Sequence, residues 1–394
     1  KNLGKGAKKM PWEERKLKDL RRKFVQACST EKISMSALCK EYGISRKTGY
    51  KWLNRYQTGE QLEDHSRRPL SSPNKTPLEL EALIIQTRLS HPTWGARKLL
   101  RLLQNQGYHS LPCASTVCNI LKRNGLVSSR ASAMHTPYKR FERKHPNELW
   151  QMDFKGDFVM ENGKRCYPLT LLDDHSRYSL CISAQPNQQW PGVHHALQEL
   201  FQIYGLPDVI LSDNGPPWGN GHRGITKFEL WMMKLNILPI HGRAMHPQTQ
   251  GKEERFHRTL KEDLLLRSSI SDLAHAQRLF DAYRQEYNSV RPHAALDMAT
   301  PDEFYATSSR KLPFRLEVPA YPSSSITCRV NLKGYVVYKG ISYYISENLA
   351  EHTLAIRELP DDCIQFCYGN FEVAKYDLVE HLLISHKISR LDTL

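Results

Sequence analysis

Residues 148–156 have the sequence Glu-Leu-Trp-Gln-Met-Asp-Phe-Lys-Gly. Apolar and polar side chains alternate along this stretch, and a period of two predicts a half-buried β-strand. Asp153 therefore lies in the middle of the predicted strand, so its carboxylate is carried by a regular element of an α/β fold.

Two further acidic residues occupy comparable positions. The apolar run in residues 207–215 ends in Asp-Asn-Gly, which predicts a strand followed at once by a turn, with Asp213 at the junction. In residues 250–266 apolar side chains recur every four positions, which predicts an amphipathic helix with Glu254 in its opening turns. Carboxylates placed in this way can converge on one edge of a sheet.

The oxygens of three such carboxylates suit Mg²⁺ or Mn²⁺. Two of these ions roughly 3.5 to 4 Å apart can activate an attacking oxygen and stabilise the leaving oxygen of an in-line phosphoryl displacement. Taken singly, an Asp or Glu is more often a solvated surface group, so the joint placement is what favours a metal site. We therefore expect two Mg²⁺ or Mn²⁺ ions per active site.

Charge is distributed unevenly along the 394 residues, a length that suits two to four domains. The net charge of +15 favours a polyanionic partner. Residues 1–144 contain 30 Lys and Arg against 11 Asp and Glu, whereas the remainder contains 26 against 30. The basic excess is wholly N-terminal, which predicts DNA-binding units there, ahead of a core that gathers its acids around metal.

Residues 34–53 predict the first of these units. A Ser-capped helix, a turn at Gly43 and a second helix after Ser45 follow the helix-turn-helix plan. The beginning of the second helix is expected to meet base edges in a major groove. A helical hairpin that binds protein is the alternative, and the local density of basic side chains favours DNA. The candidate DNA-binding residues are Arg46, Lys47, Thr48, Tyr50 and Lys51.

Residues 77–127 predict a second helix-turn-helix unit. An apolar-periodic helix precedes the segment His-Pro-Thr-Trp-Gly at 91–95, and a further helix begins after Ser115. Lys122 and Arg123 on that last helix are candidate DNA-binding residues. Trp94 is expected either to cap a small core or to contact DNA.

Polar, basic segments join the units to each other and to the core. Residues 63–77 contain three prolines and should be extended, so that Arg67 and Arg68 can contact phosphates. Residues 128–147 lack apolar periodicity and predict a second linker, which would let the DNA-binding units hold one DNA end while the core acts elsewhere.

Five motifs in residues 145–305 together resemble the integrase core of bacterial insertion-sequence transposases. These proteins belong to the retroviral-integrase-like DDE superfamily, whose fold is RNase H-like. The motifs are Trp150-Gln-Met-Asp153, Leu172-Asp-Asp-His-Ser-Arg-Tyr178, Ser212-Asp-Asn-Gly215, His246-Pro-Gln-Thr-Gln-Gly-Lys-Glu-Glu-Arg-Phe-His257 and Tyr287-Asn-Ser-Val-Arg-Pro-His293. The resemblance implies that Asp153, Asp213 and Glu254 are the catalytic and metal-binding triad. The family places its glutamate three residues after a glycine, which selects Glu254 and leaves Glu253 as the alternative.

Forty residues separate the last two acids, somewhat more than in retroviral integrases. The excess falls in the Gly- and Pro-rich residues 216–224, which are expected to form either an active-site flap that contacts the DNA end or a surface insertion. Lys252 and Arg258 are candidates for holding phosphates of the transferred strand, with plain solvated positions as the alternative. Turn or surface positions are expected for Asp157, Asp173 and Asp174.

Short strands punctuated by turns follow Pro313. They resemble the small SH3-like β-barrel of integrases, which implies DNA contact or subunit bridging. Residues 378–394 look like an appended helix or tail.

Other features bound the class of protein. The nine cysteines lack zinc-finger spacing and are expected to be reduced thiols. No apolar run of 18 residues and no signal peptide is present, so we expect no membrane partner. The resemblance to bacterial transposases implies a cytoplasmic, nucleoid-associated protein. Met10 is a plausible native start.

These observations predict a multidomain chain. It has N-terminal all-α helix-turn-helix units, a central α/β RNase H-like core with a mixed sheet, and a C-terminal SH3-like β-barrel. The predicted segments are 10–60 and 77–127 for the helix-turn-helix domains, 61–76 and 128–144 for the linkers, 145–308 for the core, 313–377 for the barrel and 378–394 for the tail.

The expected function is that of a DNA transposase. It would bind double-stranded DNA at terminal inverted repeats, cleave there to free 3′-hydroxyls and join them to target DNA. It would act as a homo-oligomer, at least a dimer on paired ends. The alternatives are an RNase H-like nuclease without strand transfer and a domesticated transposase that regulates by binding DNA.

Overall fold

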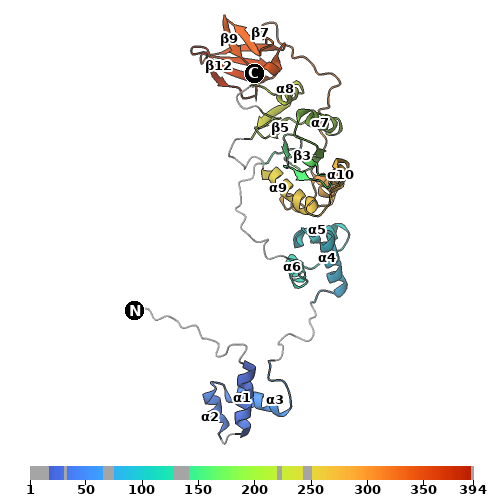
Figure 1. Ribbon diagram of the computed structural model, residues 1–394, viewed down its shortest axis with the longest axis vertical. Coiled ribbons are helices and arrows are strands. Elements are labelled where there is room, and N and C mark those ends of the chain that lie inside the picture. The colour runs from blue at the N-terminus through green and yellow to red at the C-terminus, as the bar shows by residue number, and fades with distance from the viewer. Residues whose placement is uncertain are drawn as a thin grey trace, which may run out of the picture. The chain divides into compact units, whose positions relative to one another are not determined.

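The computed structural model describes residues 17–30, 33–64, 75–127, 142–219, 224–242 and 251–391. It contains two compact units, Lys1–Lys75 and Thr76–Leu394. Figure 1 labels their helices and strands.

The first unit is a three-helix domain. Its helices are α1 (Leu17–Thr30), α2 (Met35–Glu41) and α3 (Arg46–Gln57). Ser45 caps α3, because its hydroxyl accepts a hydrogen bond from the Thr48 amide at 3.1 Å. Gly49 lets α3 approach α2 closely, since a Cβ there would stand 2.5 Å from the sulfur of Cys39. The predicted helix-turn-helix is confirmed as α2 and α3, while α1 supplies core residues such as Phe24 that the prediction lacked.

The second unit begins with another three-helix domain. Its helices are α4 (Leu78–Ser90), α5 (Ala96–Asn105) and α6 (Ala114–Arg123). Leu99 and Leu103 of α5 and Ile120 of α6 are fully buried in its core. Trp94 is 2% exposed and stacks on the ring of His91 at a centroid distance of 4.0 Å. Of the two roles expected for Trp94, the structure therefore supports the core cap.

A mixed sheet forms the centre of the second unit. Its strands are β1 (Trp150–Phe154), β2 (Phe158–Val159), β3 (Arg165–Asp173), β4 (Ser179–Gln185), β5 (Val209–Ser212) and β6 (Leu238–His241). The strand order is β2-β3-β1-β5-β6, and β4 pairs with β3. β1 is antiparallel to β3 and parallel to β5, and β5 is parallel to β6. The predicted mixed sheet is confirmed, and residues 150–154 form its central strand.

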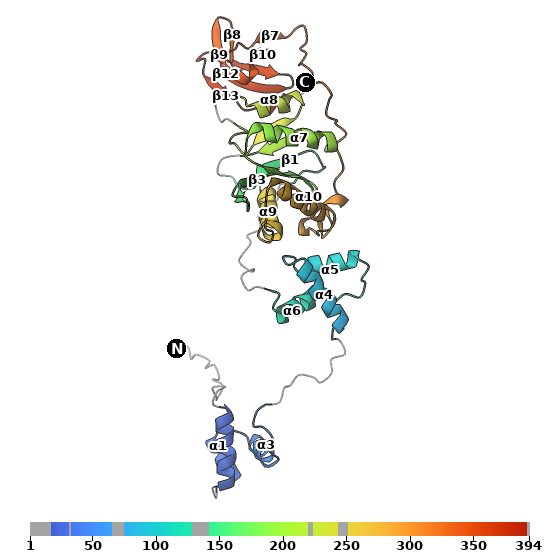
Figure 2. The same cartoon turned by 45° about the vertical axis from the view of Figure 1, so that its right-hand side comes forward.

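Helices cover both faces of this sheet (Figure 2). α7 (Trp190–Tyr204) and α8 (Lys227–Lys234) lie on one face, where Trp150 and Met152 of β1 are buried against them. α9 (Gly251–Leu260) and α10 (Leu273–Ser289) lie on the other face. Because side chains alternate along a strand, Asp153 is directed toward the α9 face. Short helical turns complete the core: η4 (Lys261–Leu265), η5 (Ala294–Leu296) and η6 (Pro301–Glu303).

The C-terminal strands form an open sheet and a separate hairpin. The elements are β7 (Ile326–Arg329), β8 (Tyr335–Tyr338), β9 (Ile341–Tyr344), η7 (Glu347–Leu349), β10 (Thr353–Leu359), β11 (Cys363–Tyr368), β12 (Phe371–Asp377), β13 (Leu383–Ser385) and β14 (Ser389–Arg390). The sheet order is β13-β12-β11-β10-β7, with β14 on β12, and β8 pairs with β9 alone.

The prediction of an SH3-like barrel is wrong on closure, because the edge strands β7 and β13 do not pair within residues 251–391. The β8–β9 hairpin covers the sheet instead of extending it, and its residues Val336 and Tyr343 are buried in one cluster with Phe366. The stretch expected as an appended helix or tail adds β13 and β14 to the sheet.

Candidate active site

Asp153 lies on β1, and Asp213 directly follows the neighbouring parallel strand β5. The pairing of β1 with β5 places Gln151 opposite Leu211, so two residues further on Asp153 and Asp213 emerge side by side. The pKa of Asp153 is raised to about 7, mainly by burial and further by the charges of Asp213 and Glu254. The backbone amide of Phe154 donates a hydrogen bond to the Asp153 carboxylate at 2.7 Å, which offsets part of that rise. The structure therefore brings the three predicted acids into one electrostatic site.

The two adjacent glutamates of α9 have different surroundings, because neighbours on a helix are about 100° apart. Glu254 is exposed, whereas Glu253 is 1% exposed and accepts a hydrogen bond from the Thr170 hydroxyl at 3.1 Å. Burial and the charge of Asp153 raise the pKa of Glu253 well above its ordinary range. Glu253 is thus packed inside the protein, and Glu254 is the carboxylate of the two that lies on the open side of α9.

His257 joins α9 to the strand that faces it. Its Nε2 lies 2.7 Å from the Thr170 hydroxyl, and its Nδ1 lies 3.8 Å from the carboxylate of Asp153. Burial, with a contribution from Lys155, lowers the pKa of His257 to about 4. A neutral imidazole therefore lies beside the first acid, a detail that the sequence motif did not disclose.

The three acids fit a divalent cation by their chemistry. All are carboxylates, which are hard oxygen donors. Burial is the main cause of the raised pKa of Asp153, and repulsion by Asp213 and Glu254, which a cation would relieve, adds to it. Among the described residues no three His, Cys, Asp or Glu side chains already form a set of metal ligands. The donors are therefore suitable, and their final arrangement would be completed by the ion.

An ion pair holds the first turn of α9. Asp174 was expected at a turn or on the surface, but it is fully buried, and so is Asp173. The Lys252 ammonium lies 2.5 Å from the Asp174 carboxylate and also donates to the Asp174 carbonyl at 2.9 Å. Gln151 of β1 donates to the same carboxylate at 2.7 Å. This cluster ties the start of α9 to the central strand, which was not predicted because burial of a turn is a long-range property.

This pairing revises the expectation for Lys252. Burial lowers the pKa of Lys252 to about 8, and its ammonium is engaged by Asp174. Lys252 therefore has a structural partner in the protein. Arg258, in contrast, is exposed and stands four residues after Glu254, on the same side of α9. Lys261, about one further turn along, is also exposed and could have been found from the same helical spacing.

Two residues of the motif at 287–293 have packing roles. The side-chain amide of Asn288 accepts from the Ser179 amide at 2.8 Å and donates to the Ser179 carbonyl at 3.0 Å. His293 is 8% exposed, and its Nε2 lies 3.2 Å from the Tyr287 carbonyl. Asn288 thus attaches α10 to the sheet.

Trp218 anchors the described part of the loop after Asp213. Trp218 is 2% exposed and stacks on Phe154 of β1 at a centroid distance of 5.6 Å. Its neighbours 220–223 lie outside the described residues, so contact of the 216–224 loop with DNA stays a prediction.

The candidate DNA-binding residues of the helical domains differ in availability. On α3, Arg46, Lys47, Tyr50 and Lys51 are exposed, while the Thr48 hydroxyl is 2.9 Å from that of Ser45. On α6, Lys122 is exposed and Arg123 forms an ion pair with Glu81. Arg67 and Arg68 lie outside the described residues.

Comparison with known families agrees with this architecture. Two family profiles described as integrase core domain match residues 143–247 and 235–301. A homeodomain-like profile matches residues 48–121, and a helix-turn-helix profile matches residues 20–69. Fold and profiles together define a DDE-type nucleotidyl transferase with helix-turn-helix DNA-binding domains, a class that depends on divalent cations.

Proteins of bacterial insertion elements are among the relatives. An uncharacterized protein of element IS136 from Agrobacterium fabrum is 34% identical over 161 residues, 39% of this chain and 80% of that protein. A 31.7 kDa protein of IS407 from Burkholderia multivorans is 26% identical over 58% of this chain and 80% of its own length. A candidate transposase of IS5376 from Geobacillus stearothermophilus is 21% identical over 92% of this chain and 88% of its own length. The chain belongs to the insertion-sequence transposases of the integrase-like DDE superfamily.

Solved structures of retroviral integrases are also similar to part of the chain. The catalytic core domain of HTLV-2 integrase, solved with magnesium, aligns with 41% of this chain and 98% of its own at 16% identity and a TM-score of 0.33.

In the described part of the chain, no helix is long and apolar enough to cross a membrane.

Proposed function

We propose that this transposase binds the terminal inverted repeats of its element, cleaves the DNA at those ends to free 3′-hydroxyls and joins them to target DNA. The observation that carries the proposal is the register of β1 and β5, which brings Asp153 and Asp213, the residue after β5, side by side, with the charge of Glu254 on α9 contributing to the raised pKa of Asp153. Two Mg²⁺ or Mn²⁺ ions held by these acids would supply activation of the attacking oxygen and stabilisation of the leaving oxygen.

The chain's own side chains position the acids and the DNA. The pairing of β1 with β5 positions Asp153 and, at the end of β5, Asp213, and the Asp174–Lys252 ion pair holds the start of α9. Arg258, exposed on the same side of α9 as Glu254, is placed to hold a phosphate of the transferred strand, and Lys261 extends that basic row. Because water or a 3′-hydroxyl is the nucleophile, no covalent protein intermediate is required.

The helical domains would select the DNA. We propose that residues 10–60 and 77–127 read two parts of each terminal repeat, with residues 61–76 and 128–144 as linkers. The core would comprise residues 145–308 and the C-terminal sheet domain residues 313–377, followed by 378–394. Joining two ends to one target favours a homo-oligomer of at least two subunits, and the C-terminal domain would contact DNA or bridge subunits.

Replacing Arg46 by Ala is expected to weaken binding of terminal-repeat DNA by roughly 1–3 kcal/mol and to relax specificity, because the start of a recognition helix meets base edges. Arg22→Ala on α1 removes the same charge away from α3 and should lower binding of specific and unrelated DNA about equally. Fluorescence anisotropy at two salt concentrations measures both. Equal effects of the two substitutions would contradict the assignment of α3 as the recognition helix.

The function is tested with purified full-length protein, labelled DNA that carries the element's terminal repeat, a target plasmid and Mg²⁺. Metal-dependent joined products support the transposase. Metal-dependent cleavage without joined products would favour an RNase H-like nuclease. Specific binding with neither cleavage nor joining would favour a regulatory DNA-binding protein.

A further inference from the structure

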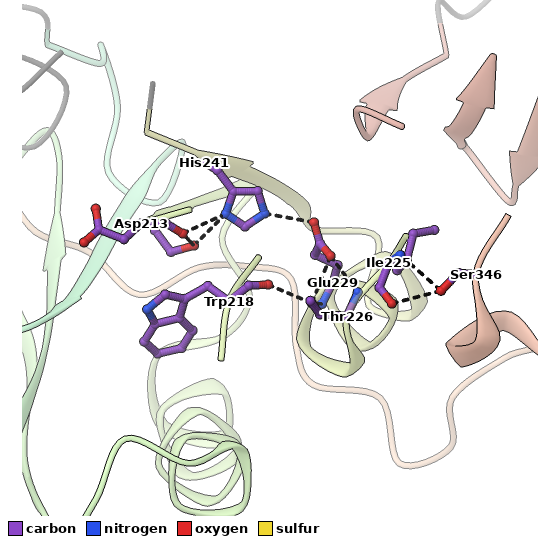
Figure 3. Close-up of polar contacts among 8 residues, drawn as sticks. Asp213, Trp218, Ile225, Thr226, Glu229, His241 and Ser346 are labelled. Atoms are coloured by element: carbon purple, nitrogen blue, oxygen red, sulfur yellow. Dashed lines mark hydrogen bonds and ion pairs between the residues drawn. The ribbon is translucent and has the colours of Figure 1, made fainter. Parts of the chain in front are cut away.

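A chain of hydrogen bonds connects the strand end that carries Asp213 to the C-terminal sheet domain (Figure 3). His241, the last residue of β6, begins it. Its Nδ1 lies 3.0 Å from the backbone carbonyl of Asp213, and its Nε2 lies 2.9 Å from the carboxylate of Glu229 on α8. In Figure 3 the side chain of Asp213 points away from the imidazole, so His241 contacts the backbone and leaves the carboxylate available to the site.

Glu229 connects His241 to the beginning of α8. Its carboxylate accepts from the Thr226 amide at 2.7 Å, and the Thr226 hydroxyl accepts from the Glu229 amide at 3.1 Å, a reciprocal cap. The Thr226 hydroxyl also lies 2.7 Å from the carbonyl of Trp218, in the loop that follows Asp213. The start of α8 is therefore bonded to both sides of the turn at Asp213.

The C-terminal domain holds the residue just before this cap. The Ser346 hydroxyl accepts from the Ile225 amide at 3.1 Å and lies 3.0 Å from the Ile225 carbonyl, to which Asn348 also donates at 2.8 Å. Ile225 and Ser346 are each 2% exposed. Gly334 packs tightly against the backbone of Ser346. A side chain at position 334 would not fit, since a Cβ there would stand 2.6 Å from the Ser346 carbonyl carbon.

Apolar packing makes the same connection. Ile225, Leu230 and Met233, which flank or belong to α8, are buried in one cluster with Val336 and Phe366 of the C-terminal strands. In Figure 1 these strands lie next to α8. The C-terminal domain thus has a buried contact, both apolar and hydrogen-bonded, with the helix that supports Asp213.

We propose that His241 and Glu229 are positioning residues for Asp213, and that Ser346 makes this positioning depend on docking of the C-terminal sheet domain. The idea rests on the proposed function, in which Asp213 is a metal ligand. Its physical basis is that a ligand displaced by about 1 Å can lower a rate by roughly 100-fold. The sheet domain would then complete the active site from outside the core, in addition to any contact with DNA.

The test compares His241→Ala and Ser346→Ala with matched controls in the full-length protein. His195→Ala removes an exposed histidine of α7, and Ser342→Ala removes an exposed serine of β9. His241→Asn is the conservative variant, because its amide N–H can replace the donor that faces the Asp213 carbonyl. For each variant we would measure the Mn²⁺ affinity by electron paramagnetic resonance and the affinity for terminal-repeat DNA. The cleavage rate at saturating DNA and the melting temperature complete the comparison.

We expect His241→Ala to lower the Mn²⁺ affinity and the cleavage rate by about 10- to 100-fold, because it removes a hydrogen bond that positions a metal ligand. The affinity for DNA should stay within about twofold of wild type. Ser346→Ala should lower both in the same direction, His241→Asn should recover most of the loss, and the controls should match wild type.

Unchanged Mn²⁺ affinity and cleavage in His241→Ala would overturn the proposal, as would a loss that His241→Asn fails to reduce. A loss in His241→Ala with no change in Ser346→Ala would overturn the part played by the C-terminal domain. If wild type binds Mn²⁺ but cleaves no terminal-repeat DNA, the proposed function fails, while the Mn²⁺ comparison still decides whether His241 positions Asp213.

Discussion

Replacing Glu254 by Gln is expected to lower the rate of strand cleavage and joining by at least about 1000-fold, because an anionic metal ligand contributes several kcal/mol of transition-state stabilisation. Glu254 is exposed, and glutamine has nearly the same volume, so folding and affinity for terminal-repeat DNA should stay close to wild type. Single-turnover cleavage in Mg²⁺ and anisotropy with the same DNA measure the two effects.

Glu253→Gln is the matched control, since the two residues are adjacent and chemically identical. Glu253 is 1% exposed, its pKa is raised, and a glutamine can still accept the hydrogen bond from Thr170. We therefore expect Glu253→Gln to keep the cleavage rate within about tenfold of wild type, the effect of roughly one buried hydrogen bond. A large loss in Glu253→Gln with an active Glu254→Gln would make Glu253 the third acid.

Replacing Asp174 by Ala is expected to destabilise the second unit by about 3–5 kcal/mol, because it leaves the half-buried ammonium of Lys252 without its counter-charge. It also removes the acceptor for Gln151 and for the backbone amide of Arg143, which donate at 2.7 and 2.8 Å. Urea denaturation of the full-length protein, followed by tryptophan fluorescence, measures the shift of the midpoint.

Asp157→Ala provides the comparison for that substitution. Asp157 pairs with Arg165 in a partly exposed ion pair, and exposed pairs contribute about 0–1 kcal/mol. Asp174→Asn should fall between the two, since an amide keeps an acceptor but loses the charge. If Asp174→Ala shifts the midpoint no more than Asp157→Ala, the ion pair with Lys252 does not hold the start of α9.

Local sequence predicted the helices and central strands because each has a local cause. Ser45 caps α3 through an amide three residues away, and alternation over residues 150–154 selects a strand wherever that strand finally packs. The three acids could be named for the same reason, since Asp153, Asp213 and Glu254 stand at recognisable positions of their own elements.

Closure of the C-terminal sheet could not be predicted in this way. Turn residues locate each strand, but whether β7 meets β13 depends on where the β8–β9 hairpin packs. Val336 and Tyr343 bury that hairpin on the face of the sheet, and the edges stay apart. Residues 383–385 and 389–390 form strands because β12 offers backbone hydrogen bonds to them.

Short local patterns were enough to predict the helix-turn-helix units and the strands of the core. The family and the candidate acids followed from the order of five such motifs along residues 145–305. Three features became visible only in the folded chain: Asp174 is buried against Lys252, Glu253 and Glu254 face different surroundings, and His241 contacts the backbone of Asp213. Burial and hydrogen bonding between distant segments are properties of the packed chain, because a side chain's solvent and partners are set only when the elements come together.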